Sequence, residues 1–201
     1  MFVPDIPPPS LTTQLTALSY YTTLSVLAAS GKAIDSRDAL SDEERQLLDD
    51  GKPVILGENG NYQAWIVAEG SLVTAWEVLT DYNRFGEFLS NVKASQLLES
   101  EGNRRVFQQV NRIIFNQTAT VSIGVVETYL RTIEFHLVEG DLGGLDGVWS
   151  IEPLPKENRV LISHRVSVDP GSEENRSLFF RLYRNGIEDS LRGYRREIEG
   201  R

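Results

Sequence analysis

Six β-like runs between residues 94 and 168 lie so close together that they restrict the fold more than any other feature of the chain. The runs are 94–99, 104–111, 113–126, 132–139, 148–154 and 159–168. A connection between parallel strands needs a crossover of about a dozen residues or more, usually a helix, and none of the gaps is long enough. We therefore predict a meander of antiparallel strands.

The residues before this meander predict a strand hairpin and two short helices. Residues 54–56 and 62–68 are strand-like runs on either side of a turn that is rich in glycine and asparagine. In 71–80, apolar residues recur at helical spacing. An earlier helix is expected to begin at Ser41, because Ser41 and Glu44 have the spacing of a capping box.

A long amphipathic helix is predicted for residues 172–199. Six apolar residues recur there at intervals of 3, 4, 4, 3 and 4, which is the spacing of one helix face. They are Phe180, Tyr183, Ile187, Leu191, Tyr194 and Ile198. The other faces carry arginines interleaved with glutamates, which we interpret as a solvated surface with i,i+4 ion pairs; an anionic membrane or partner is the alternative. Sheet and helix together indicate the α+β class.

Side-chain alternation along the strands predicts which residues face the core. The inward set of 159–168 includes His164, and that of 113–123 includes Gln117. An unpaired buried polar group costs about 1–3 kcal/mol, so each should bond to the backbone or to a trapped water. The alternative is that the two side chains line a cavity and orient an oxygen atom of a ligand. His164 is also a candidate general acid or base, because an unperturbed histidine has a pKa of about 6.5.

Composition and motifs exclude several classes of protein. The chain has no cysteine, which rules out disulfides, Cys-based zinc sites, iron–sulfur clusters and a cysteine nucleophile. Its net charge of −9 disfavours a nucleic-acid-binding surface, which needs clustered positive charge. The only histidines, His136 and His164, are expected to face opposite ways, so we predict no metal site. No phosphate-binding or nucleophile-elbow motif occurs, and we expect no cofactor.

The first 50 residues are predicted to be an N-terminal extension of a main domain at 51–201. The extension has a proline-rich start and one or two helices, and we expect it to cover a sheet edge. No apolar run approaches the roughly 20 residues that span a bilayer. No Lys or Arg precedes Lys32, whereas a secretory signal begins with basic residues. We therefore expect a cytoplasmic protein.

Three segments, 76–89 (WEVLTDYNRFGEFL), 135–141 and 147–153, carry a family resemblance. They resemble a helix–loop signature and two central strands of the START-like (Bet v 1-like, SRPBCC) superfamily. Within it, the chain is similar to the polyketide cyclase/dehydrase and lipid-transport branch. It departs from that pattern at Gly86 and Ser90, where relatives often have proline, and this bears on the rigidity of the loop.

The resemblance covers about residues 50–198 and implies the helix-grip fold. In this fold a curved antiparallel sheet wraps around a long C-terminal helix, here preceded by an N-terminal helical extension. The acidic helix before the first strand also resembles cyanobacterial and plastid members.

The resemblance further implies an apolar chamber between the sheet and the long helix. Its expected wall, together with the two inward polar residues, comprises Phe115, Gln117, Val121, Phe135, Leu137, Trp149, His164, Phe180, Tyr183 and Ile187. Residues 82–89 and the loop 140–147 are expected to flank an entrance, with Gly143 and Gly144 in a flexible lid.

The implied function is binding or transport of a hydrophobic small molecule such as a lipid, isoprenoid, quinone or polyketide. Two alternatives stay open: a cyclase or dehydrase enzyme that uses a shaped pocket, and a protein-interaction module with a filled core. The resemblance brings no fixed catalytic set, so no catalytic residue is carried over. We expect a monomer or weak dimer that binds no nucleic acid, and transient contact with a membrane surface stays open.

Overall fold

The computed structural model describes residues 37, 40–112, 118–154 and 158–201. Residues 35–201 form one compact unit, and residues 1–34 are assigned to another. The predicted site residues Phe115 and Gln117 lie outside the described residues, as does the proline-rich start of the predicted extension.

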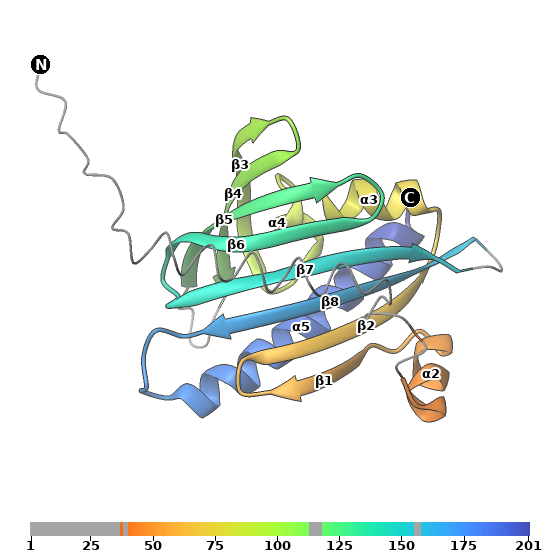
Figure 1. Cartoon of the computed structure of the whole chain (residues 1–201), viewed down its shortest axis with the longest axis horizontal. Helices are drawn as coiled ribbons and strands as arrows, with labels where there is room; N and C mark the ends of the chain where they lie inside the picture. Colours follow the sequence, from red (N-terminus) through yellow and green to blue (C-terminus); the bar gives the residue numbers. More distant parts are fainter. Residues whose placement is uncertain (1–36, 38–39, 113–117, 155–157) are drawn as a thin grey trace, which may run out of the picture. The chain divides into compact units, whose positions relative to one another are not determined.

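Eight antiparallel strands form one sheet in the order β1-β2-β8-β7-β6-β5-β4-β3 (Figure 1). The strands are β1 (Val54–Glu58), β2 (Asn61–Glu69), β3 (Val92–Glu101), β4 (Arg104–Arg112), β5 (Thr118–Thr128), β6 (Thr132–Gly140), β7 (Gly144–Pro153) and β8 (Arg159–Asp169). Strands β3 to β8 pair consecutively, which confirms the predicted meander. The β1–β2 hairpin joins the meander at its far edge, where β2 pairs with β8.

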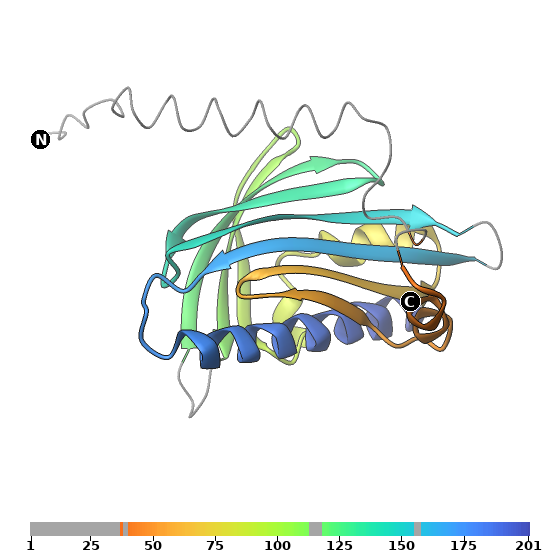
Figure 2. The same cartoon turned by 60° about the horizontal axis from the view of Figure 1, so that its bottom comes forward.

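The long helix α5 (Arg176–Glu199) lies along the concave side of the curved sheet (Figure 2). Helices α3 (Leu72–Leu79) and α4 (Phe85–Phe88) carry the chain from β2 to β3 on the other edge of the sheet. This arrangement confirms the predicted α+β, helix-grip fold. No helix among the described residues is long and apolar enough to cross a membrane.

Local signals start the helices where the sequence analysis places them, except for α5. The hydroxyl of Ser41 accepts a hydrogen bond from the Glu44 amide, and the Glu44 carboxylate accepts one from the Ser41 amide, so the predicted capping box opens α2 (Asp42–Asp49). Helix α5 begins at Arg176 rather than at residue 172. Asn175 has a φ of 57°, a left-handed conformation that a helix cannot extend through.

Strand alternation sorts the core as predicted. Along β8, one face is buried throughout its length. It comprises Val160, Ile162, His164, Val166 and Val168. In β6, Ile133 and Phe135 are buried while Glu134 and His136 are exposed. A period of two therefore assigns the concave face of these strands correctly.

The connection between β6 and β7 corrects one prediction. We expect a glycine-rich loop over 140–147, but β7 begins at Gly144, which pairs with Asp169 of β8. Gly147 is needed because a Cβ there would lie 2.2 Å from the Arg165 carbonyl oxygen and 2.6 Å from Cζ of Phe135. Gly147 lets the strands and an aromatic ring approach closely. The connection is thus limited to residues 141–143, and the amides of Asp141 and Gly143 donate to the carbonyl oxygens of Thr120 and Asp169.

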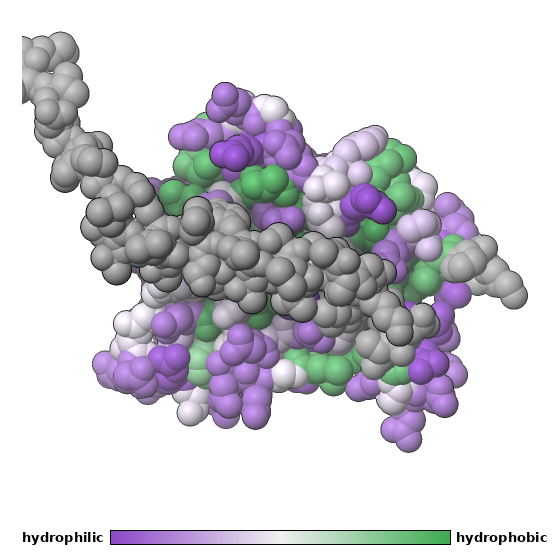
Figure 3. Space-filling view, viewed as in Figure 1, coloured by the Kyte–Doolittle hydropathy of each residue, from purple (hydrophilic) through white to green (hydrophobic). Residues whose placement is uncertain are grey.

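A second apolar cluster lies on the outer face of the sheet. Leu40 and Leu48 from the α2 region pack with Trp65, Val67 and Leu161 of β2 and β8. The carboxylates of α2 remain largely exposed. Elsewhere on the face shown in Figure 3, apolar residues form small patches among hydrophilic ones. Large apolar patches are often interaction sites, and scattered residues of this kind need no partner.

Candidate functional site

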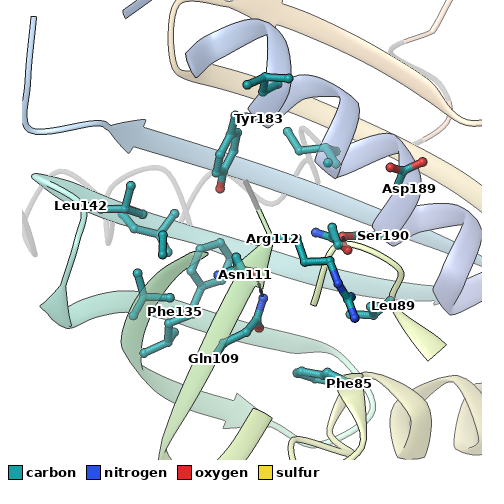
Figure 4. Close-up of a pocket in the computed structure, with 18 of the residues that line it drawn as sticks. Phe85, Leu89, Gln109, Asn111, Arg112, Phe135, Leu142, Tyr183, Asp189 and Ser190 are labelled. Carbon is teal, nitrogen blue, oxygen red and sulfur yellow. Dashed lines mark hydrogen bonds between the residues drawn. The ribbon is translucent and has the colours of Figure 1, made fainter. Parts of the chain in front are cut away.

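A cavity of about 800 Å³ lies between the concave face of the sheet and α5 (Figure 4). Its wall comes from β4 to β8, from α5 and from the segment that joins α3 to β3. Pockets for small-molecule ligands are usually about 300–1,000 Å³ and mostly apolar. The cavity is therefore large enough to enclose a ligand of small-molecule size.

The floor of the cavity is a stack of aromatic rings, which we call the aromatic floor. The ring of His164 lies between Trp149, at 3.7 Å between centroids, and Phe135, at 5.6 Å. Tyr194 of α5 meets Trp149 edge-on at 5.2 Å. Offset stacks and edge contacts of this kind are favourable arrangements for aromatic rings. The floor thus joins β6, β7 and β8 to the C-terminal half of α5.

His164 is 6% exposed and uncharged at neutral pH. Burial in this apolar stack lowers the pKa of His164 to about 3, although the Val148 carbonyl opposes the shift. Its Nδ1 atom has no hydrogen-bond partner among the described residues. The expected protein partner is therefore absent at Nδ1, and the neutral ring keeps a single N–H group as a hydrogen-bond donor.

Six of the predicted site residues line the cavity. They are Val121, Phe135, Trp149, His164, Tyr183 and Ile187. Leu137 is half-buried and packs against the core outside the cavity wall. Phe180 turns away from the cavity toward the β1–β2 turn, where its ring lies 2.9 Å from the Cβ position of Gly60, and the Arg176 guanidinium covers it at 5.3 Å.

One end of the cavity is polar, and the sequence analysis did not identify it. Gln109 and Asn111 follow Phe107 on the inward face of β4, and all three line the cavity. Continuing the alternation from Phe107 would have found them. Asn91 and Ser190 line the same cavity from the loop before β3 and from α5.

The polar side chains at this end pair with one another. Nε2 of Gln109 donates to Oδ1 of Asn111 at 2.5 Å (Figure 4). The Ser190 hydroxyl donates to Oδ1 of Asn91 at 3.3 Å. Arg112 also lines this end and donates from Nη1 to the carbonyl oxygens of Ser90 and Val92, at 2.7 and 2.5 Å. We call Asn91, Gln109, Asn111, Arg112 and Ser190 the polar end.

Residues 82–89, which are expected to flank the entrance, are hydrogen-bonded to the sheet. Tyr82 donates from its hydroxyl to Glu127 at 2.8 Å, and Asn83 accepts a hydrogen bond from the amide of Leu97 at 2.9 Å. Burial and the Glu127 carboxylate raise the pKa of Tyr82, so the hydroxyl keeps its proton and this bond. The segment therefore forms a fixed wall of the cavity, with Phe85 among the residues that line it.

The chemistry of the lining is that of a binding cavity. Among the described residues, no three His, Asp or Glu side chains gather as a metal site. Burial raises the pKa of Tyr183 and of Tyr194, so both phenols stay protonated. An apolar wall with a few convergent polar groups can hold and orient a small molecule.

A family model described as polyketide cyclase/dehydrase and lipid transport matches residues 69–181. The chain belongs to this family. The matched segment runs from the end of β2 into α5 and contains most of the cavity wall. No curated protein sequence matches the chain significantly.

Solved structures share the fold of this chain at low sequence identity. The protein TTHA0849 from Thermus thermophilus is 16% identical with a TM-score of 0.62, over 69% of this chain and 96% of that one. A STAR-related lipid transfer protein from Xanthomonas axonopodis is 14% identical with a TM-score of 0.62, over 73% and 92%. The Zhui aromatase/cyclase from Streptomyces sp. R1128 is 14% identical with a TM-score of 0.60, over 73% and 94%.

These similarities establish the fold and leave the activity open. The structural relatives include both a lipid transfer protein and an aromatase/cyclase, so one architecture accommodates carriers and enzymes. The function of this member of the family must be argued from its own cavity.

Proposed function

We propose that the protein binds a hydrophobic small molecule in the cavity between the sheet and α5, as a carrier. The observation that supports this most directly is the cavity of about 800 Å³, with an aromatic floor and a small number of polar groups at one end. Burial of apolar ligand surface supplies roughly 25 cal/mol per Å². A lipid, isoprenoid, quinone or polyketide would find both the space and the chemistry here.

The same cavity weighs against the two alternatives. A protein-interaction module with a filled core has no need of an internal space of this size. A cyclase that relies on His164 would need a group whose pKa lies near the working pH. Burial instead holds the pKa of His164 at about 3, which makes the ring a poor acid and a weak base at neutral pH.

Native mass spectrometry of the purified full chain tests the proposal. We expect a stoichiometric mass increment that organic extraction removes, and the extract identifies the class of ligand. A clean apo mass, together with no uptake from a panel of lipids, quinones and polyketides, would contradict the proposal and favour the interaction module.

A variant that fills the cavity supplies the structural control. Val121→Trp places a large ring inside the cavity, because Val121 lines it. Val138→Trp makes the same change on the outer face of β6, where the side chain is 53% exposed. We expect only Val121→Trp to abolish ligand retention, with far-UV circular dichroism showing that both variants are folded. Equal retention by the two variants would place the ligand elsewhere.

A further inference from the structure

The two asparagines at the polar end use their oxygen atoms within the protein. Oδ1 of Asn111 accepts from Gln109 at 2.5 Å, and Oδ1 of Asn91 accepts from Ser190 at 3.3 Å. An asparagine amide carries one acceptor oxygen and one NH₂ group with two donors. The oxygens are engaged, so the NH₂ groups are left for other partners. Neither Nδ2 atom has a hydrogen-bond partner among the described residues.

Arg112 adds a positive charge that the described residues do not neutralise. Its Nη1 donates to the carbonyl oxygens of Ser90 and Val92, which holds the guanidinium in place. No carboxylate of the described residues lies within ion-pair distance of it, whereas Arg84, Arg105 and other arginines of the domain have one. Backbone carbonyls use only part of the donor capacity of a guanidinium, which has five N–H groups.

Two carboxylates also line the rim of the cavity and must be considered. Glu174 lies before the start of α5 and is exposed. Asp189 lines the cavity from α5 and is exposed as well. Water screens these exposed charges, and it screens the exposed guanidinium of Arg112 in the same way. The groups that remain at the polar end are mainly donors, namely the NH₂ groups of Asn91 and Asn111 and the N–H groups of Arg112 beyond Nη1, against one amide acceptor, Oε1 of Gln109.

We propose that the ligand is an elongated apolar molecule whose polar end is a carboxylate, bound by Asn91, Asn111 and Arg112. This inference rests on the proposed function, since it names the class of molecule that the cavity takes. A carboxylate accepts several hydrogen bonds and carries the charge that Arg112 complements. The apolar part of the molecule would lie over the aromatic floor. A free fatty acid and a carboxylated isoprenoid share this chemistry.

A pair of ligands that differ only at the polar end tests the assignment. Palmitate and 1-hexadecanol have the same chain length, and Trp149 in the floor reports their binding through its fluorescence. At neutral pH we expect the full-length protein to bind palmitate about tenfold more tightly or better, because charge-assisted hydrogen bonds are about twice as strong as neutral ones.

Substitutions then assign the preference to particular residues. Asn111→Leu keeps the approximate shape of the side chain and removes its NH₂ group, and we expect it to reduce the preference for palmitate to within about threefold. The affinity for 1-hexadecanol should change little. Arg104→Gln is the matched control, because Arg104 is an exposed arginine at the opposite end of the same strand. Arg112→Gln removes the charge at the polar end and should reduce the preference as Asn111→Leu does, whereas Arg104→Gln removes an equal charge far from the polar end and should leave the preference intact.

The possible outcomes separate this assignment from the proposed function. Equal binding of both compounds by the unmodified protein would overturn the carboxylate assignment and leave the proposed function standing. A preference for palmitate that Arg112→Gln and Arg104→Gln reduce equally would also overturn it, since general electrostatics would then be the cause. Binding of neither compound, with no ligand found by native mass spectrometry, would contradict both.

Discussion

The two halves of α5 differ in how they contact the sheet. In the C-terminal half (residues 188–199), Leu191, Tyr194 and Ile198 are all buried. In the first eight residues, all of which the structure describes, Phe180 is the one buried side chain. The C-terminal half is therefore anchored in the core and adds Ser190 and Tyr194 to the cavity wall, whereas the start of the helix mainly covers the cavity.

The polar contacts follow the same division. Arg195 in the anchored half donates to the carbonyl oxygen of Gly51 and pairs with Glu199. At the other end, Asn175 precedes the helix in a left-handed conformation and makes no side-chain capping bond. A missing cap typically costs about 1 kcal/mol of helix stability. A continuous apolar stripe on one helix can thus serve two purposes: it packs in the core, and it lines a cavity.

The largest expected effect compares a leucine from each half. Leu191 is fully buried, so Leu191→Ala should lower the free energy of unfolding by about 2–5 kcal/mol. Leu182 is half-buried at the cavity wall. Leu182→Ala should lower the free energy of unfolding by less than about 1.5 kcal/mol, because folding buries less apolar surface at this residue than at Leu191. Urea denaturation measures both. Equal losses would show that the two halves are anchored alike.

The second test is the pH dependence of stability, to which His164 in the aromatic floor contributes. The pKa of His164 is about 3 in the folded protein and about 6.5 in an unfolded chain, so the unfolded state binds more protons between these values. The contribution of His164 to the free energy of unfolding therefore has its full value above pH 6.5 and decreases as the pH falls below 6.5. The loss due to His164 should be about 2 kcal/mol between pH 6.5 and 5.

Two histidine variants isolate this pH dependence. His164→Gln should remove it, since an amide does not titrate. His136→Gln, on the outer face of β6, should retain it, because His136 is exposed. Urea denaturation across the pH range measures the difference between each variant and the unmodified protein. If both variants keep the pH dependence of the free energy of unfolding, the carboxylates are its cause instead.

The smallest effect concerns two glycines within α5. A Cβ at Gly186, which lines the cavity, would meet Nδ2 of Asn91 at 3.7 Å, an ordinary contact. Gly186→Ala should therefore raise the free energy of unfolding by up to about 1 kcal/mol through helix propensity. Gly193→Ala should lower it, because a Cβ there would lie 2.7 Å from Leu89 and 3.0 Å from the Phe88 carbonyl oxygen. Thermal unfolding measures both changes. Shifts of the same sign in the two variants would contradict the comparison.

The fold could be predicted from the sequence because its signals are local. Short gaps between strands exclude a crossover, and period-two alternation assigns faces correctly along β6 and β8, where Phe135 and His164 fall on the concave side. The capping box at Ser41 likewise depends on two residues. Each of these signals is contained within a few neighbouring positions.

The site was predicted less completely because its limits depend on contacts between distant segments. Phe180 belongs to the apolar stripe of α5, yet it packs at the β1–β2 turn, which no helical periodicity reveals. Gln109 and Asn111 were missed because polar residues on a strand are usually taken to face solvent. Gly144 and Gly147 look like loop residues until their close neighbours across the sheet are known.

The pairing of β2 with β8 sets the order in which the molecule can be completed. Ile66 lies opposite Ile162, so a strand made early in synthesis waits for one made late. Long-range pairing of this kind slows folding, because a large loop must close before the contacts reward it. Until then β2 exposes an unpaired edge on a growing chain, the type of surface that promotes aggregation. The cavity can therefore close only after both β8 and α5 have been synthesised.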